Sequence, residues 1–329
     1  MKNIFCALLI CFSIHNTISS QTPEIKGKPI TEIFTDFHYI VNDSSKFNGF
    51  DLNRAYLGYN FIPGGNFTST IVVNVGSPLD LAPGSKAKRY AFFREASITY
   101  LKEKLTVSFG LANTRIFDFQ QRFWGKRYLS AEFQSLYGYG TVADLGVVAD
   151  YKFNDIVKVD LAFLNGEGYT NIQLDNSIKT TYGVTVTLPS KIAIRLYGDI
   201  MKPKGIWQAT FIGFAGFTTE LLSLGAEASY KSNIDLTSGH NVWGVSATGS
   251  LFPNKKFELF TRLDYSASVA VQGDQLHWDY FLDGCYIISG IQRNFSNNIK
   301  LALNYRGVFP YDPSKNITSA IYLNGLFRF

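Results

Sequence analysis

Histidine, serine and carboxylate side chains are the groups of this chain that could perform acid–base or nucleophilic chemistry, and the histidines among them are few. After residue 20 the histidines are His38, His240 and His277. His240 follows Ser238 in TSGHNVWG, which faintly suggests a hydrolytic group, and His277 stands in QLHWDY. Hydrolysis needs a nucleophile, a base and an orienting group that converge, and this spacing shows no convergence. The chain is therefore predicted not to be an enzyme.

Cofactor chemistry is not expected either. Cys285 is the one cysteine after residue 20, so the sequence offers neither a disulfide framework nor a thiolate metal site. The glycines of NGEGYTN are too few and in the wrong register for a phosphate-binding loop. The formal net charge is +5, and the sequence contains no run of basic residues of the kind that binds nucleic acid. We expect no cofactor, no metal and no nucleic-acid partner.

The residues that could act on charged solutes are concentrated in residues 114–139. Four cations accompany many aromatic rings in this segment, TRIFDFQQRFWGKRYLSAEFQSLYGY, namely Arg115, Arg122, Lys126 and Arg127. Cations in a narrow passage with low-dielectric walls attract anions by focusing the electric field. Leu129, Phe133 and Leu136 are spaced four and three apart, which predicts about three turns of helix. The segment either folds into a channel as a constriction, or it packs against the inner wall or lies on the outer rim.

A regular series of β-strands must position these residues. In EKLTVSFGLAN, for example, large apolar residues alternate with small or polar ones, a period of two that is typical of a strand. Aromatic residues make up 16% of the chain and charged residues only 17%, which favours strands with one apolar face. Sixteen strands are predicted, with fourteen or eighteen as alternatives, over residues 31–41, 50–61, 66–76, 89–101, 104–113, 140–153, 156–166, 178–188, 191–201, 206–217, 221–232, 241–252, 256–267, 279–295, 298–309 and 317–329.

The connections between these strands alternate between tight and long. IPGG, KEK, FND, LPSK, FPNKK and FSNN are tight, whereas VNDSSKFN, GSPLDLAPGSKAK and NGEGYTNIQLDNS are long, and MKPKG is a brief link where a long one is due. This asymmetry, with an even strand number, is typical of a bacterial outer-membrane barrel. Because every backbone group must be paired in hydrocarbon, the last strand is expected to pair with the first. We predict an all-β, multi-pass transmembrane barrel of about 16 antiparallel strands, with an inward-folding, partly helical third loop.

The two ends of the chain fit this localisation. MKN, the apolar run IFCALLICFSI and HNTISS have the pattern of a secretory signal, with cleavage expected between Ser20 and Gln21. The predicted organisation is a signal peptide at 1–20, a short periplasmic segment at 21–30 and the barrel at 31–329. The chain ends in AIYLNGLFRF, an alternating strand that closes on Phe329. Such an end resembles the signal that the outer-membrane assembly machinery recognises, so this machinery is an expected partner together with outer-membrane lipid.

Sixteen strands leave an aqueous lumen that the polar faces of the strands would line. Alternation and the 114–139 segment together give the expected pore-lining cations, which are Arg54, Arg115, Arg122, Lys126, Arg127, Arg195, Arg262 and Arg306. An alternative is that many of these cations pair with acidic residues on neighbouring strands and stiffen the wall. Arg94 falls on an apolar face, which a β-bulge or a position near the membrane rim would explain.

Several stretches resemble a known family. GFDLNRAYLGYNF at 49–61, FFREASITY at 92–100, RFWGKRYLSAEFQSLYGYGTVADLGV at 122–147 and FLNGEGY at 163–169 are similar to the phosphate-selective porin (O and P) family, in particular to its short members from Bacteroidetes-type bacteria. The resemblance covers about the first half of the chain, and the second half matches only in strand rhythm. It implies a trimeric channel of sixteen or eighteen strands that often favours anions. The phosphate-binding lysine and arginine ladder of that family has no counterpart here.

The sequence therefore predicts an outer-membrane porin, a passive diffusion channel for small hydrophilic solutes that favours anions, and the family resemblance implies that it forms a homotrimer. The alternative is a non-conducting barrel with a structural, adhesive or assembly role, its lumen plugged by residues 114–139. Both hypotheses need the same wall, so the sequence does not separate them.

Overall fold

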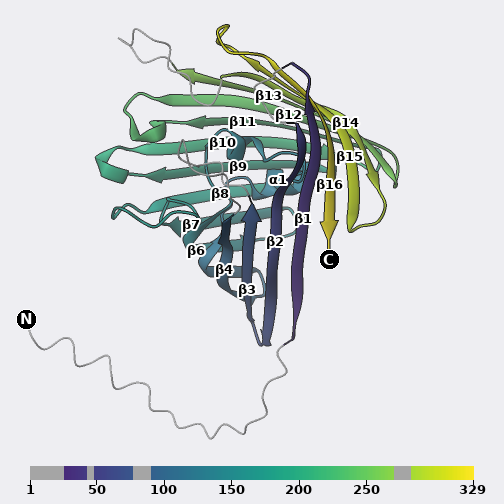
Figure 1. Cartoon of the computed structure of the whole chain (residues 1–329). Coiled ribbons are helices and arrows are strands. Elements are labelled where there is room, and N and C mark those ends of the chain that lie inside the picture. Colours follow the sequence, from purple (N-terminus) through teal and green to yellow (C-terminus); the bar gives the residue numbers. More distant parts are fainter. Residues whose placement is uncertain (1–25, 43–47, 77–89, 270–282) are drawn as a thin grey trace, which may run out of the picture.

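Alternation of apolar and polar residues produces sixteen β-strands that join into one closed antiparallel sheet (Figure 1). The structure, a computed structural model, describes residues 26–42, 48–76, 90–269 and 283–329. The predicted signal peptide and His277 lie outside these residues. The strands are Lys26–Ile40 (β1), Gly49–Gly64 (β2), Phe67–Gly76 (β3), Tyr90–Lys102 (β4), Leu105–Asn113 (β5), Ala143–Lys152 (β6), Val157–Leu164 (β7), Lys179–Thr187 (β8), Ile192–Met201 (β9), Gln208–Thr218 (β10), Leu222–Lys231 (β11), Asn241–Asn254 (β12), Phe257–Val269 (β13), Gly284–Asn294 (β14), Ile299–Pro310 (β15) and Thr318–Arg328 (β16).

The predicted strand number and the predicted closure are both confirmed. β1 pairs with β16 in antiparallel register, with Ile33 opposite Phe327 and Phe37 opposite Leu323, so the first and last strands lie side by side (Figure 1). The backbone N–H of Phe329 donates to the carbonyl oxygen of Thr31 at 3.0 Å and extends this seam to the last residue. β1 begins at Lys26, five residues before the expected start at residue 31, so residues 26–30 belong to the wall.

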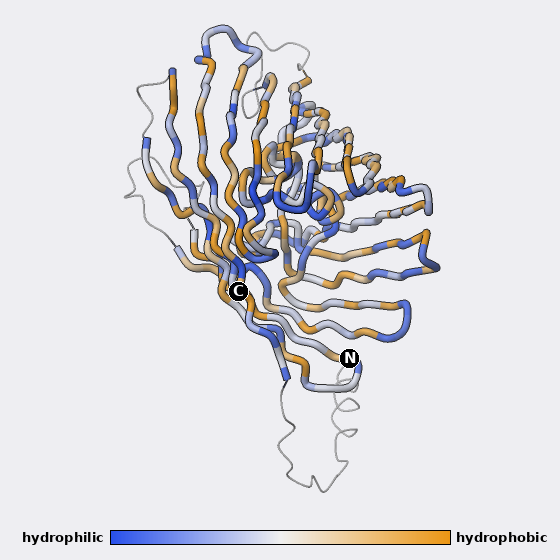
Figure 2. Tube along the Cα trace, turned by 90° about the vertical axis from the view of Figure 1, so that its right-hand side faces the viewer, coloured by the Kyte–Doolittle hydropathy of each residue, from blue (hydrophilic) through white to orange (hydrophobic). Residues whose placement is uncertain are grey.

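The outer face of the wall is apolar. Large exposed side chains such as Phe37, Ile98, Phe109, Leu196 and Leu263 occur on strands all around the ring. Along the strands they alternate with inward-facing residues, many of them polar, and Figure 2 shows this alternation of hydropathy along the trace. A continuous apolar exterior of this size marks a surface that contacts lipid. None of the helices among the described residues is long and apolar enough to span a membrane.

Tight turns lie at one end of the barrel and longer connections at the other, as the sequence predicts. Tight turns join β2 to β3, β4 to β5, β6 to β7, β8 to β9, β10 to β11, β12 to β13 and β14 to β15. At the other end, longer segments join β1 to β2, β3 to β4, β5 to β6 and β7 to β8, while only six residues, 202–207, join β9 to β10. Since outer-membrane barrels have short periplasmic turns, the long-connection end is the extracellular one.

A β-bulge explains the unexpected position of Arg94. The register between β3 and β4 shifts so that Val72 faces Glu95 and Val73 faces Phe93, which leaves Arg94 as the extra residue. Its guanidinium donates to the Oδ1 atom of Asn113 at 2.5 Å, on the lumen side of the wall. The predicted bulge is confirmed, because the extra residue turns a charged side chain away from lipid.

Candidate functional site

The segment between β5 and β6 folds into the barrel and is the main feature of the lumen. It leaves the wall after Asn113, returns at Ala143 and contains two short helices, Asp118–Trp124 (α1) and Phe133–Leu136 (α2). α1 lies within the ring of strands (Figure 1). We call residues 114–142 the inner loop. The expected helix of about three turns through Leu129 and Leu136 is wrong, because α2 is a single turn and α1 lies earlier in the chain.

One side of the inner loop packs against the wall formed by β9, β10 and β12. Phe133, which is 0% exposed, belongs to a buried cluster with Ile212 and Val242 of the wall. The loop supplies most of the other members of this cluster, which include Ile116, Phe117, Tyr137 and Tyr139. Close packing of this kind fixes the loop to the wall by dispersion and apolar burial.

The other side of the inner loop reaches a different part of the wall. Trp124, Tyr128 and Leu129 lie in a second buried cluster with residues of β1, β2, β3, β13, β14, β15 and β16, namely Phe34, Tyr56, Val72, Phe260, Ile288, Ala302 and Leu326. The hydroxyl of Tyr128 also donates to the Oε1 atom of Gln292 at 2.6 Å. The inner loop therefore bridges the lumen and contacts the wall on both sides.

Wall cations hold the backbone of the inner loop. Arg195 of β9 donates to the carbonyl oxygen of Arg115 at 2.7 Å, and Arg262 of β13 donates to that of Ala131 at 2.6 Å. Lys231 of β11 donates to the carbonyl oxygen of Tyr139 at 3.1 Å. These charge-assisted bonds satisfy loop carbonyl groups that no helix or strand pairs.

Six of the eight predicted pore-lining cations form ion pairs inside the barrel. Arg195 binds Asp160 at 2.7 Å and Arg262 binds Asp264 at 2.6 Å, while four loop cations pair as Arg115–Asp150, Arg122–Asp118, Lys126–Glu258 and Arg127–Glu132. The alternative weighed from the sequence, pairing with acidic residues on neighbouring strands, describes none of these six pairs: Arg195 and Asp160 lie on β9 and β7, on either side of β8, and Arg262 and Asp264 share β13. The four loop cations pair within the inner loop or between the loop and the wall. The role of these cations in a pore stays a prediction.

The two remaining cations bind neutral groups. Arg54 donates to the hydroxyl of Tyr56 at 3.1 Å. Arg306 donates to the Oδ1 atoms of Asn304 and Asn324 at 2.9 and 2.8 Å, and its guanidinium lies 3.6 Å from the ring centroid of Tyr322. Both residues face the lumen and belong to wall strands on the β1 to β3 and β14 to β16 side.

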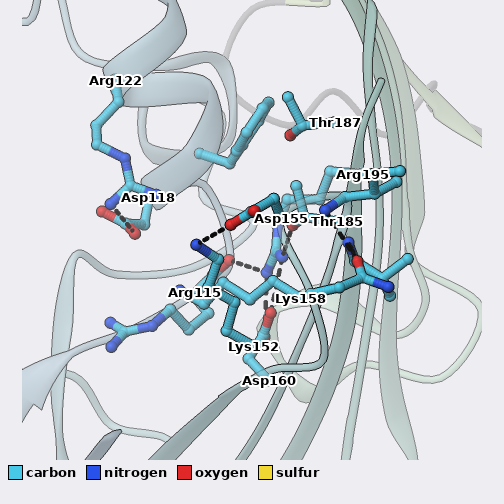
Figure 3. Close-up of a pocket in the computed structure, with 14 residues that line it drawn as sticks. Arg115, Asp118, Arg122, Lys152, Asp155, Lys158, Asp160, Thr185, Thr187 and Arg195 are labelled. Atoms are coloured by element: carbon cyan, nitrogen blue, oxygen red, sulfur yellow. Dashed lines mark hydrogen bonds and ion pairs between the residues drawn. The ribbon is translucent and has the colours of Figure 1, made fainter. Parts of the chain in front are cut away.

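A polar cavity of about 210 Å³ lies between α1 and the wall at the tight-turn end of the barrel. Figure 3 shows Asp118 and Arg122 on the helix facing Thr185, Thr187 and Arg195 on the strands. Five basic and three acidic side chains line the cavity, and a fourth carboxylate, that of Asp150, pairs with Arg115 and Lys158 from outside the lining. Positive charge is therefore in excess by one, the basic residues being Arg115, Arg122, Lys152, Lys158 and Arg195. The structure thus brings together Arg115, Arg122 and Arg195 of the predicted cations.

Two turn residues of this cavity, Lys152 and Asp155, were missed from the sequence. Lys152 and Asp155 lie in or beside the β6–β7 turn and form an ion pair at 2.7 Å, and Lys158 binds Asp150 at 2.8 Å. The charge and hydrogen bond of Lys152 hold the pKa of Asp155 below its usual range. The sequence does contain a clue to these residues, because a tight turn with charges at both ends is expected at the rim of the barrel. Only the path of the inner loop, however, makes this turn one wall of a cavity.

Lys126 is the loop cation least available to solutes. It lies buried beside Glu258, its ammonium group 4.5 Å from the ring centroid of Trp124. Burial lowers the pKa of Lys126, and the carboxylate of Glu258 opposes that shift.

Among the residues that the structure describes, no cluster of three or more histidine, cysteine or acidic residues is arranged to hold a metal ion. His240 is placed by backbone hydrogen bonds with Thr237 and Ile234 in the β11–β12 connection.

Comparison with solved structures identifies the architecture. OmpF of Salmonella typhi, in complex with daunomycin, matches with a TM-score of 0.70 and 11% identity over 93% of this chain and 98% of that one. A loop L8 deletion mutant of OmpT, an outer-membrane protein of Vibrio cholerae, matches with a TM-score of 0.66 and 12% identity over 93% and 99%. OmpT in its trimer form gives 0.63 and 13% over the same shares. The chain is an outer-membrane-type β-barrel.

The sequence itself matches no protein-family model and no curated protein. At 11–13% identity the structural likeness shows the fold alone. The closed sheet, its apolar exterior and this likeness are the architecture of a multi-pass protein of the bacterial outer membrane.

Proposed function

We propose that the protein is a passive outer-membrane channel for small hydrophilic solutes, with a preference for anions and with its conductance limited by the inner loop. The observation that carries this proposal is the third long connection, which leaves β5 and folds into a sixteen-stranded barrel whose inner face carries many polar side chains. The excess of basic side chains around the cavity at the tight-turn end supports the anion preference. No catalytic step is part of the proposal.

The proposal extends to the oligomeric state of the protein and to its family resemblance. A homotrimer is consistent with the trimer form of OmpT of Vibrio cholerae, whose fold this chain shares. The similarity of residues 49–61, 92–100, 122–147 and 163–169 to phosphate-selective porins supports a channel, although no family model matches the chain. Phosphate selectivity is not part of the proposal, because the lysine and arginine ladder of that family has no counterpart here.

A second function has a specific observation in its favour. Apolar side chains of the inner loop contact the wall on both sides of the lumen, and many inward polar residues, such as Gln292 and Asn324, are buried. A lumen filled in this way would not conduct, and the barrel would then serve a structural, adhesive or assembly role.

Planar bilayer recording separates these two functions. Purified, heat-modifiable protein added to a bilayer is expected to give discrete current steps, and their reversal potential in a salt gradient is expected to lie on the anion-selective side. A silent bilayer with correctly folded protein would favour the plugged barrel. Discrete steps with cation selectivity would retain the channel and remove the anion preference.

A further inference from the structure

Two adjoining apolar hollows mark the outer face of β7–β15. They have volumes of about 930 and 810 Å³ and share Leu196, Gly213, Ala228 and Val245 among their lining residues. Leu196 and Val245 are exposed, while their strand neighbours point into the lumen, so the hollows lie on the lipid side of the wall. We call the two together the outer groove.

Small residues that face one another across three strands form the floor of the outer groove. Gly213 of β10 lies opposite Ala228 of β11, and one step along the same strands Ala215 lies opposite Ala226. Ala226 in turn lies opposite Ala247 of β12. Leu196 on β9 and Leu263 on β13 line the sides with larger side chains, so the wall is hollowed where a barrel surface is usually convex.

Aromatic rings border the outer groove on the side of the long connections. Phe211 lies opposite Tyr230 and Tyr230 opposite Trp243, which makes a continuous row across β10, β11 and β12. The ring of Trp243 also lies 5.5 Å from that of Tyr265 on β13. Aromatic rows of this kind sit where hydrocarbon meets the polar headgroups. The row therefore places the groove below it in the outer leaflet and the bilayer centre.

Two lysines lie beyond the aromatic row, in the unusually short connection between β9 and β10. Lys202 and Lys204 are both exposed, and the ammonium group of Lys202 lies 5.1 Å from the ring centroid of Trp207. Trp207 is four residues before Phe211, a separation of about 13 Å along an extended chain. A long connection would rise away from the membrane, whereas this short one keeps both cations at headgroup height above the groove.

We propose that the outer groove binds one phosphate-bearing, multi-acyl lipid of the outer leaflet, with acyl chains in the groove and a phosphate at Lys202 and Lys204. The apolar hollow forfeits dispersion contacts unless an apolar chain fills it, and the cations directly above it select a lipid whose headgroup is anionic. A second barrel would fill the groove but supplies no reason for the paired cations. The proposal is independent of whether the lumen conducts.

Native mass spectrometry of the full-length protein in detergent tests this proposal, with bisphosphorylated hexa-acyl lipid A as the probe and its dephosphorylated form as the comparison. One bound lipid A per barrel is expected. Ala228→Phe fills the floor and is expected to weaken binding about tenfold. The double variant Lys202→Gln/Lys204→Gln is expected to weaken binding of lipid A about tenfold or more, and to leave binding of the dephosphorylated form unchanged.

Matched variants away from the groove control for general effects. Ala149→Phe changes another outward alanine, on β6, and Lys255→Gln/Lys256→Gln removes two exposed lysines at a tight turn. Neither is expected to change lipid binding. Equal binding by all variants, equal loss in the control variants, or a dimer that Ala228→Phe dissociates would each overturn the proposal. If Ala228→Phe reduces the yield of folded protein, Lys202→Gln/Lys204→Gln still tests the proposal, because both lysines are exposed.

Discussion

Arg262 is buried between the wall and the inner loop, at 1% exposure, where it binds both Asp264 and the carbonyl oxygen of Ala131. Replacement by methionine leaves the carboxylate of Asp264 buried without its counter-charge, which costs about 3–5 kcal/mol. We expect Arg262→Met to lower the free energy of unfolding by about that amount. The measurement is a denaturant titration of the purified barrel in detergent, followed by heat-modifiable mobility.

Two further variants define this effect. Arg262→Met/Asp264→Leu removes both charges and is expected to recover most of the lost stability, because no uncompensated charge remains. Arg122→Gln breaks an ion pair with Asp118 on the helix surface, where the arginine side chain is 62% exposed, and should change stability by less than about 0.5 kcal/mol. A large loss in Arg122→Gln, or none in Arg262→Met, would contradict the assignment.

For single residues, the sequence predicts well which face of the wall a side chain occupies, but it predicts poorly which residue that side chain binds. Alternation places Arg195 and Arg262 on the inner face, and the structure agrees. The partners of Lys126 and Arg127 depend on the path of the inner loop, which sets Lys126 beside Glu258, a residue 132 positions away in sequence. Residue spacing within the segment does not show which distant residue each cation binds. From the sequence the four cations therefore look like a solvent-exposed cluster, whereas in the structure three of them are buried or nearly buried.

The inner loop is the element on which the functional account depends, and Phe133 anchors it. Phe133→Ala removes a fully buried ring from the cluster with Ile212 and Val242, a change that costs about 3–5 kcal/mol in a packed core. We expect the loop to detach from the wall while the sheet stays closed. Limited trypsin digestion measures this, because the bonds after Lys126 and Arg127 become accessible.

The control for this variant is Phe109→Ala, which removes a ring from the lipid-facing surface. It should leave the inner loop resistant to trypsin. Equal resistance of Phe133→Ala and the unmodified protein would show that the loop is held by its ion pairs and hydrogen bonds alone.

The elements differ in how far sequence determines them. All sixteen strands follow from a period of two, because each strand is confined between lipid and lumen and every second residue must face one or the other. The helix expected at Leu129–Leu136 fails for a tertiary reason. Leu129 packs against Ile288 and its neighbours, whereas Phe133 packs on the opposite wall, so the two residues cannot share one face of a helix.

For the whole molecule, Phe329 is predicted to direct assembly of the barrel. The residue is 68% exposed, while its backbone N–H closes the seam with Thr31. Phe329→Ser keeps that backbone bond, so we expect a reduced share of heat-modifiable protein in the outer membrane, measured on isolated membranes after expression in a bacterial host. Phe295→Ser at a tight turn is the control. Equal amounts of all three proteins would remove the role of Phe329.

Charge selectivity is also a property of the whole lumen. Lys126 and Arg127 pair with carboxylates, so reversing them would disturb the loop before it altered the field. Arg122 and Lys152 line the cavity and keep large exposed fractions. Arg122→Glu/Lys152→Glu is expected to shift the reversal potential in a salt gradient toward cations, whereas Lys256→Glu at another tight turn is not. An unchanged potential would exclude this cavity from the conduction path.

The most direct measurement compares single-channel conductance of the intact protein and of a variant in which residues 114–142 are replaced by a short Gly-Asn linker. The deletion removes Lys126 from Glu258 and Arg115 from Asp150, but the emptied lumen admits water to both carboxylates, and Asp150 keeps Lys158. Since Arg195 and Arg262 also keep Asp160 and Asp264 as partners, the wall should tolerate the change. We predict discrete steps from both proteins in the same bilayer system, with clearly larger steps from the variant. Steps of equal size, or silence from both folded proteins, would contradict the claim that the inner loop limits flow through an open barrel.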